Sequence, residues 1–268
     1  MTVQTLYTAA TGMQALETKL DVIANNMANI NTTGFKKDRA NFEDLFYRQY
    51  RLPGAEDADG NRTATGIEVG LGVRVGSMQS NHEQGAFETT SNPLDLAVEG
   101  DGFFRVIDPN GDFFYTRAGN FGINANQQLV LGSAQTGWVE ASGITIPPEA
   151  VDVVISSDGQ VQIRTQNSAT LQNVGQIQLA KFINPDGLLK LGDNLFKETD
   201  ASSTPQLGAP AQQGFGAVRQ GFLEASNVEP VNELIDLITT QRAFELNSQV
   251  VQAGDQIMQT VANLRRFA

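Results

Sequence analysis

Residues 3–30 place apolar side chains with the period of an α-helix. Two rows of such residues recur every seven positions, and the second row is offset from the first by three residues. The rows are Leu6, Met13, Leu20 and Met27, and Ala9, Leu16, Ile23 and Ile30. Polar residues fill most positions between them. Apolar residues at both core positions of nearly four heptads are typical of a coiled-coil seam, so we predict that this helix packs along another helix.

Residues 230–267 carry a second helical pattern, which starts at Pro230, a residue that the first turn of a helix accepts. Three rows recur here at heptad spacing, and they include small and polar residues. The rows are Ala243, Val250, Ile257 and Leu264; Asn247, Gly254 and Val261; and Leu237, Phe244, Val251 and Met258. This stripe is wider than one partner helix covers, so we predict that the helix contacts more than one neighbour.

Between the helical segments the apolar period changes to two, which is typical of β-strands. The alternating residues are Ile67, Val69, Leu71, Val73 and Val75, and then Leu94, Leu96 and Val98. Turn signals recur in residues 108–111, 156–159 and 184–187, and we expect the first two to close β-hairpins. Across the first hairpin, Phe103-Phe104 is expected to face Phe113-Phe114, with one ring of each pair pointing inward.

These patterns together predict an α+β protein. Residues 1–46 are expected to hold the N-terminal helix and the following segment of an inner coiled-coil domain, and residues 217–268 its C-terminal helix. Residues 95–216 are expected to form an all-β outer domain. Residues 47–94 are expected to form an extended excursion with a β-hairpin, and residues 51–66 within it are polar and rich in glycine.

Composition argues against several classes of function. The chain has no cysteine and a single histidine, His82, which leaves no thiolate nucleophile and no zinc site built from cysteine and histidine. A net charge of −12 argues against nucleic acid or an anionic membrane as the main partner. No apolar run approaches the roughly 20 residues that span a bilayer, and the N-terminus lacks the pattern of a cleaved signal peptide. We therefore expect no membrane insertion and no Sec-type signal.

Candidate catalytic chemistry is sparse. The glycines of residues 70–76 lack the spacing of a dinucleotide loop and lie in an alternating strand. Asp95, Glu99 and Asp101 could supply a carboxylate pair for peptidoglycan hydrolysis, although a turn-rich β segment explains them as well. Trp138 fits a β-domain core; stacking of a sugar on Trp138 or Tyr115 is the alternative, in a secreted glycan-binding adhesin. We predict no enzyme activity, no cofactor and no metal.

Four asparagines crowd the end of the N-terminal helical pattern: Asn25, Asn26, Asn29 and Asn31. Asparagine is a poor helix former because its side chain competes for backbone hydrogen bonds. Amides hydrogen-bond without adding charge, however, so they can be buried between packed helices and fix their register. Gly34 is expected to end the helix in a left-handed conformation, with Lys36 and Lys37 near the negative end of the helix dipole.

Three long segments resemble signatures of the bacterial flagellar axial proteins, the family of rod, hook and hook-associated proteins. They are ANNMANINTTGFKKDRANFEDLF from residue 24, NPLDLAVEGDGFFRV from residue 92 with YTRAGNF from residue 115, and LEASNVEPVNELIDLITTQRAFELNSQ from residue 223. They occur in the order found in the family and cover much of the chain.

The chain is further similar to the distal-rod subgroup of that family. The subgroup pattern matches Arg51, Pro53, Gly54, Gly66, Val69, Gly70, Gly72, Val73, Gln84 and Gly85, and NPDGLLKLGDNLFKET at residues 184–199. Hook proteins are usually longer in the middle, and proximal-rod relatives usually lack an equivalent of residues 51–86. A hook or proximal-rod protein is the alternative within the family. The acidic stretch from Glu56 to Asp59 departs from the pattern.

The resemblance implies a structural subunit of the flagellar distal rod, which polymerises helically into a rigid hollow drive shaft and transmits torque from the motor to the hook. The apolar rows of both helices would then be polymerisation seams, and the four asparagines would bond neighbouring subunits. Residues 51–86 would touch neighbouring subunits and keep the rod stiff.

The resemblance also implies partners and a location. The partners would be further copies of the chain, proximal rod proteins, the hook protein, the P- and L-ring bushing proteins where these exist, and the flagellar type III export apparatus. The location would be the basal-body rod where it crosses the periplasm.

Overall fold

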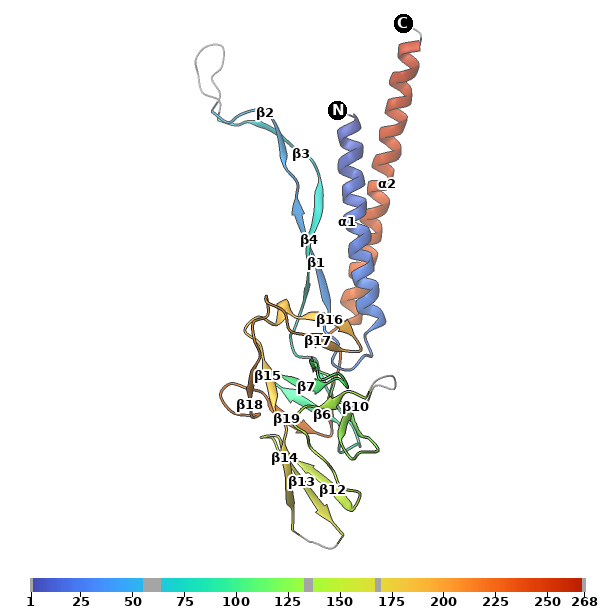
Figure 1. Ribbon diagram of the computed structural model, residues 1–268. Coiled ribbons are helices and arrows are strands. Elements are labelled where there is room, and N and C mark those ends of the chain that lie inside the picture. The colour runs from blue at the N-terminus through green and yellow to red at the C-terminus, as the bar shows by residue number, and fades with distance from the viewer. Residues whose placement is uncertain (1, 55–63, 133–136, 167–169, 267–268) are drawn as a thin grey trace. The chain divides into compact units, whose positions relative to one another are not determined.

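The computed structural model describes residues 2–54, 64–132, 137–166 and 170–266, which form two long helices and a β-rich middle (Figure 1). The chain divides into two compact units. Unit 1 consists of residues 1–27, 38–79 and 229–268, and unit 2 of residues 28–37 and 80–228. Each unit is therefore assembled from segments that are far apart in the sequence. The acidic stretch from Glu56 to Asp59 lies outside the described residues.

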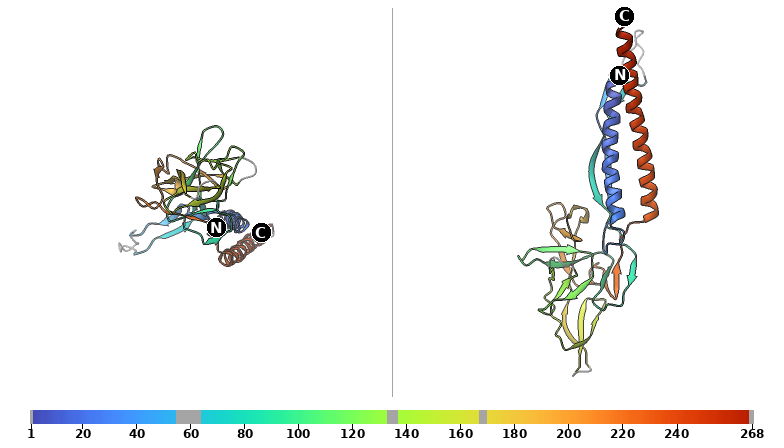
Figure 2. Two further views of the ribbon diagram at one scale, coloured as in Figure 1. Left: turned by 90° about the horizontal axis from the view of Figure 1, so that it is seen from below. Right: turned by 90° about the vertical axis from the view of Figure 1, so that its right-hand side faces the viewer.

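Unit 1 is built on the helices α1 (Thr2–Ala28) and α2 (Pro230–Arg266), which lie side by side (Figures 1 and 2). They are antiparallel, because residue 6 lies beside residue 254, residue 12 beside residue 247, and residue 26 beside residue 233. Both helices that the periodicity predicts are therefore present. Within the described residues, neither helix contains a stretch apolar enough to cross a bilayer.

The strands of unit 1 form a long two-stranded ribbon. β1 (Asp38–Asp44) pairs with β4 (Val73–Ser80), and β2 (Tyr47–Arg51) pairs with β3 (Ile67–Gly70). The backbone bond from Leu45 N to Gly72 O, 2.8 Å, connects the two pairs. The run from residue 67 to residue 75, predicted as one strand, is interrupted at Gly72, whose φ of +125° favours glycine.

Unit 2 is almost entirely β. Its strands are β5 (Phe87–Thr89), β6 (Leu96–Glu99), β7 (Phe103–Ile107), β8 (Phe113–Thr116), β9 (Phe121–Ile123), β10 (Leu129–Leu131), β11 (Val139–Glu140), β12 (Ala150–Ile155), β13 (Gln160–Thr165), β14 (Gln172–Gln176), β15 (Leu179–Lys181), β16 (Leu189–Gly192), β17 (Leu195–Lys197), β18 (Gln206–Gly208), β19 (Ala217–Gln220) and β20 (Phe222–Glu224), with a short 3₁₀ turn at Pro185–Gly187.

Within the described residues the largest sheet of unit 2 has nine strands, in the order β16-β17-β8-β7-β11-β10-β9, with β15 pairing with both β7 and β18. A three-stranded sheet, β12-β13-β14, and the pairs β6-β19 and β5-β20 complete the unit. Strands from residues 87–99 and 217–224 thus pair with each other, so the end of the β region closes on its beginning.

Both hairpins predicted from turn signals are present. β7 pairs with β8 and β12 with β13, and Gly111 and Gly159 take positive φ values in the two turns. The prediction that Phe103-Phe104 lies opposite Phe113-Phe114 is wrong. The register sets Phe113 opposite Ile107 and Phe114 opposite Val106.

Two apolar clusters lie on opposite faces of the β7-β8 region. Phe104 and Val106 belong to the larger cluster, and Phe103 to a smaller one with Tyr115 and Phe182. Adjacent residues of a strand point to opposite faces. Both rings of the first pair are therefore buried, whereas Phe113 is exposed.

Candidate assembly surfaces

The two predicted apolar rows of α1 are covered within the chain. All eight residues are buried or half-buried. The two helices approach closely at Gly254, where a Cβ atom would lie 2.7 Å from Leu6 Cδ2. At Gly12 a Cβ atom would lie 3.4 Å from Asn247 Nδ2, an ordinary contact distance. Ile30 lies beyond the helix, in the turn that follows Ala28, so the helical part of the predicted seam ends at Met27.

α2 is apolar on two sides. One side packs toward α1 and includes the half-buried Leu237, Asn247 and Val251 and the buried Thr240. Other apolar residues of the helix are between 43% and 67% exposed: Val231, Leu234, Ile235, Ile238, Leu246, Val250, Ile257 and Val261. We call these eight residues the outer face of α2. A single α1 covers only one side of α2, which leaves the outer face in water.

The predicted residues of α2 are divided between these two sides. Leu237, Ala243, Asn247 and Val251 are half-buried, whereas Phe244, Val250, Ile257, Met258 and Val261 are exposed in the single chain. The side chain of Leu264 lies outside the described residues. The broad stripe in the sequence therefore corresponds to two surfaces of one helix.

Among the four asparagines, Asn26 acts within its own chain. Its side chain is 2% exposed, its Nδ2 donates to Asp38 O, and its Oδ1 accepts from Asp38 N, both at 2.9 Å. Nδ2 also lies 3.5 Å from Glu233 Oε2 on α2. Asn26 thus ties the start of β1 to the helix pair, while Asn25 and Asn31 are exposed and Asn29 is half-buried.

The glycines of the predicted excursion permit close backbone contacts. A Cβ atom on Gly66 would lie 2.5 Å from Arg51 O, across the β2-β3 pair. One on Gly72 would lie 2.2 Å from Thr11 Oγ1, so the ribbon touches α1 at this point. Pro53 and Gly54 are exposed in the turn after β2, and Val73 is half-buried at the start of β4. Gln84 and Gly85 lie in unit 2.

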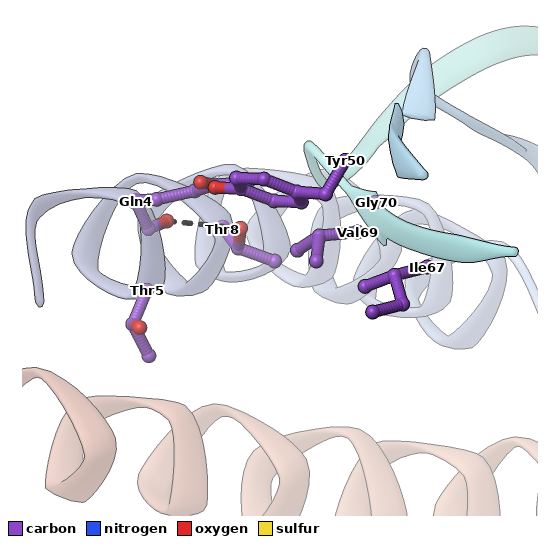
Figure 3. A pocket seen from close by; sticks show the side chains of 7 residues that line it. All are labelled: Gln4, Thr5, Thr8, Tyr50, Ile67, Val69 and Gly70. Carbon is purple, nitrogen blue, oxygen red and sulfur yellow. Dashed lines mark hydrogen bonds between the residues drawn. The ribbon is translucent and has the colours of Figure 1, made fainter. Parts of the chain in front are cut away.

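A groove runs between α1 and the ribbon (Figure 3). Its volume is about 600 Å³, and it is lined by Gln4, Thr5, Thr8, Tyr50, Ile67, Val69 and Gly70. Tyr50, Ile67 and Val69 are between 40% and 56% exposed. An open groove with apolar walls on the ribbon side is a surface suited to an apolar occupant.

Unit 2 contains a buried ionic cluster of Lys36, Arg117 and Glu224. Lys36 Nζ lies 2.5 Å from Glu224 Oε1, and Arg117 Nη1 lies 3.5 Å from Glu224 Oε2. Lys36 is 1% exposed, and Glu224 is fully buried. Burial lowers the pKa of Lys36, while the charge of Glu224 and its hydrogen bond oppose that shift. Two cations share one carboxylate, so loss of Glu224 would deprive Lys36 and Arg117 of the carboxylate that they have in common.

Backbone groups from distant segments complete this cluster. Lys36 Nζ donates to Glu83 O at 2.7 Å, and Gly85 N donates to Glu224 Oε1 at 3.1 Å. Gly34 N donates to Glu224 O at 2.8 Å. The cluster therefore joins the loop after α1, the segment before β5, and β20.

The expected position of Gly34 and Lys36 is wrong. α1 ends at Ala28, so Gly34 lies several residues beyond the helix, although its φ of +69° is left-handed as predicted. A Cβ atom there would lie 2.7 Å from Ala118 N, which makes glycine necessary for close packing on the end of β8. Lys36 comes two residues after Gly34, and its side chain is buried in unit 2 instead of facing the end of α1.

The candidates for other chemistry are engaged in ordinary contacts. Asp95 Oδ1 accepts from Asn92, Glu99 pairs with Arg219, and Asp101 pairs with Lys181. Tyr115 is 2% exposed, and Trp138 is half-buried against Phe114 with 4.9 Å between ring centroids, so neither is an open platform for a sugar. No group of acidic and histidine side chains in the described part of the chain is placed to hold a metal.

Comparison with known proteins places these surfaces in a family. Three segments match family models: residues 6–36 match "Flagella basal body rod protein", residues 97–163 "Flagellar hook protein FlgE/F/G D1 domain", and residues 219–264 "Flagellar basal body rod FlgEFG protein C-terminal". The flagellar basal-body rod protein FlgG of Caulobacter vibrioides is 47% identical, over 98% of this chain and 99% of its own. The chain belongs to the FlgG family of flagellar basal-body rod proteins.

Other FlgG proteins are similar over nearly the same length. Those of Borreliella burgdorferi and Bacillus subtilis are each 40% identical, over 97% and 98% of this chain and 98% and 99% of their own. The resemblance predicted from the sequence is confirmed, and this member of the FlgG family is a structural rod subunit of the flagellar basal body. Its family assembles into the flagellar axial structure.

Sequence patterns did not predict the ionic cluster of this FlgG-family chain. One signal was available: Lys36, Arg117 and Glu224 each lie in one of the three segments that carry the family resemblance. Each also has an apolar residue on at least one side: Phe35 before Lys36, Ala118 after Arg117, and Leu223 before Glu224. That context could have suggested that the three charges are buried together.

Proposed function

We propose that the chain polymerises helically into the distal rod, a stiff hollow shaft that transmits torque from the flagellar motor to the hook. The observation that carries this proposal is the outer face of α2, whose eight apolar residues are exposed in the single chain. Removing apolar area from water favours association, and further copies of the same helix pair offer matching apolar area.

The polymer is open-ended because its contacts are heterologous. The side of α2 toward α1 is used within the chain, so we assign the outer face of α2 on one copy to a different surface of the next copy. Such contacts build a filament when the rotation between copies does not close a ring. In that arrangement we assign α1 and α2 to a coiled-coil inner layer, with the predicted heptad rows as its seams.

The exposed asparagines have a place in this arrangement. Asn25 and Asn31 lie at the end of α1 and in the turn after it, and both are exposed. We assign them to hydrogen bonds between copies, where an amide adds directionality without charge. Asn26 is assigned to its own chain because both its oxygen and its nitrogen already bond Asp38.

The partners follow from the same proposal. The ends of the polymer meet proximal rod proteins and the hook protein, and its outside meets the P- and L-ring bushings where these exist. The chain reaches its place in the periplasm through the flagellar type III export apparatus. The family of flagellar rod and hook proteins to which the chain belongs supports these assignments.

Folding of unit 1 is coupled to polymerisation in this proposal. A helix with an uncovered apolar side gains part of its stability only when a neighbour packs on it. Circular dichroism of the isolated chain should therefore show less helix than the polymer. Equal helix content in both would contradict the coupling.

Charged substitutions on the outer face test the polymer itself. The variant Ile235→Glu with Ile238→Glu places charge at two exposed positions, so each chain should fold while polymerisation is lost. Ile183→Glu, at a residue of unit 2 that is 73% exposed, is the control and should leave polymerisation intact. Sedimentation and electron microscopy measure the outcome. Tubes formed as well by the double variant as by the control would disprove the proposal.

A further inference from the structure

The groove between α1 and the ribbon is not filled by α2 of the same chain. Thr5 points toward α2, whereas Gln4 and Tyr50 lie on the other side of α1, next to Val69 (Figure 3). The α2 helix of the same chain contacts α1 at Leu6 and Gly12, and neither of these residues lines the groove. The groove therefore presents a second surface of α1 to an additional partner.

Among the described residues, the charges around the groove are mixed, with a small positive excess. The α1 segment beside it, residues 2–16, contains no charged residue. β2 contributes Arg48 and Arg51, and β3 contributes Glu68 alone. The Arg48 guanidinium lies 5.1 Å from the ring centroid of Tyr50, which lines the groove. An occupant that is apolar and weakly acidic would fit these walls.

Part of the outer face of α2 is apolar and lies in a weakly acidic stretch of the helix. Val250 and Ile257 are 43% and 52% exposed, and Ala253 between them is exposed as well. Positions three and seven residues after Val250 lie close to it around a helix, so the three side chains form one short stripe. From residue 243 to residue 263 the only charged residues are Glu245 and Asp255, both acidic.

The dimensions of the two surfaces agree. From residue 250 to residue 257 a helix rises about 10 Å. The strand β3, from Ile67 to Gly70, also extends about 10 Å along the groove. Two turns of helix thus match the length of the groove wall, and the alternating Ile67 and Val69 offer apolar contact along it.

We propose that the groove of one copy receives residues 250–257 of α2 from a second copy of this chain. The inference rests on the proposed polymerisation and names the surfaces that meet in it. The groove and the stripe are different surfaces, so this contact is heterologous and propagates from copy to copy. The net negative charge of this part of α2 complements Arg48 only in a general way, because Asp255 lies on the side of the helix opposite the stripe.

Disulfide crosslinking tests this contact, and the absence of cysteine from the natural chain makes it free of background. Val69→Cys marks the groove wall and Ala253→Cys the middle of the stripe, so the result does not depend on which way the helix runs. Polymers are assembled from an equal mixture of the two variants and mildly oxidised. The expected product is a dimer of one chain of each kind, because a disulfide needs Cα atoms within about 7 Å.

The matched control replaces Ala253→Cys by Gln252→Cys, an exposed neighbour that points about a quarter turn away. It should give little dimer with Val69→Cys, and each variant alone should give none of the mixed product. Polymers without the 69–253 dimer, or with as much dimer from the control, would overturn the inference while leaving polymerisation standing. Failure of the unsubstituted chain to polymerise would instead disprove the proposed function.

A pair of introduced charges decides the case in which a cysteine blocks assembly. Val69→Glu and Ala253→Lys should each weaken polymerisation, because each places an unpaired charge in the contact, and the two together in every chain should restore it. Restoration supports the contact, because the two introduced charges attract across it. A double variant as weak as the worse single variant would overturn it.

Discussion

Unit 1 and unit 2 place their apolar side chains in opposite ways. In unit 2, Phe104, Val106 and Leu179 are fully buried in a core that strands from many parts of the chain enclose. In unit 1, Val231 and Leu246 on α2 are 67% and 62% exposed, and the ribbon exposes aromatic residues such as Phe46. Unit 2 therefore satisfies its own core, whereas unit 1 has apolar surface to share with other copies.

This difference separates two kinds of stability. The free energy of unfolding of unit 2 is set by contacts inside one chain and does not depend on concentration. The stability of unit 1 rises with the concentration of partner copies, because binding to the folded state adds to it. Variants that act on one unit and not on the other test the distinction.

The largest effect is expected from Glu224→Ala, which removes the carboxylate shared by Lys36 and Arg117. Leaving two buried cations without this partner should lower the free energy of unfolding of unit 2 by about 3–5 kcal/mol. Denaturant titration of the isolated chain measures this loss. Glu88→Ala, at an exposed residue of β5, is the control and should change it by less than about 0.5 kcal/mol. A Glu224 variant as stable as the control would show that the cluster does not stabilise unit 2.

The next effect is a pH dependence confined to unit 2. Burial raises the pKa of Glu140 to about 7, from a usual value of 4.5. The unfolded chain releases this proton at lower pH than the folded chain, so stability should fall as the pH rises from 4.5 to 7. Glu140→Gln should remove about 3 kcal/mol of that fall, given about 1.4 kcal/mol for each pKa unit.

Denaturant titrations of both proteins between pH 4.5 and pH 8 test this assignment. The difference between them isolates Glu140, because the histidine His82 is present in both. Parallel pH profiles would mean that Glu140 carries no such penalty.

A smaller, local effect is expected in unit 1 from Asn26→Ala. The substitution leaves Asp38 N and Asp38 O without their side-chain partner, which should cost about 1–3 kcal/mol. Hydrogen exchange at the Asp38 amide should become faster, while amides in the core of unit 2 stay protected. Asn31→Ala, at an exposed residue, is the control. Unchanged exchange at Asp38 would contradict the role given to Asn26.

The smallest effect on the isolated chain is expected from Leu246→Ala. The side chain is 62% exposed, so truncation should change the free energy of unfolding by less than about 0.5 kcal/mol. The same change should raise the concentration at which polymers form, as sedimentation measures. A large loss of stability in the isolated chain would mean that unit 1 is already closed without partners, and the contrast with unit 2 would disappear.

The parts of the fold that sequence patterns predicted are those held by local periodicity. The heptad rows of residues 3–30 and 230–267 marked both helices, and the turns at Gly111 and Gly159 marked two hairpins. Each of these signals lies within a few tens of residues, and it follows directly from the geometry of a helix or a strand.

The parts that were missed depend on partners far along the chain. Lys36 was expected near the helix end because no local pattern points to Glu224, 188 positions away. The register that separates the two phenylalanine pairs depends on the turn geometry, which sequence alone places less well. The two sides of α2 were signalled only by the width of the stripe, since periodicity does not say which side faces which neighbour.

The bond between Lys36 and Glu224 has a consequence for the order of events during synthesis. The lysine emerges early, yet its carboxylate arrives only after most of the chain has been made. Until then the loop that carries Lys36 has no reason to enter an apolar interior, because an unpaired ammonium group is strongly disfavoured there. Closure of unit 2 is therefore a late, cooperative step, and a ribosome that stalls before residue 224 would release a chain unable to complete it.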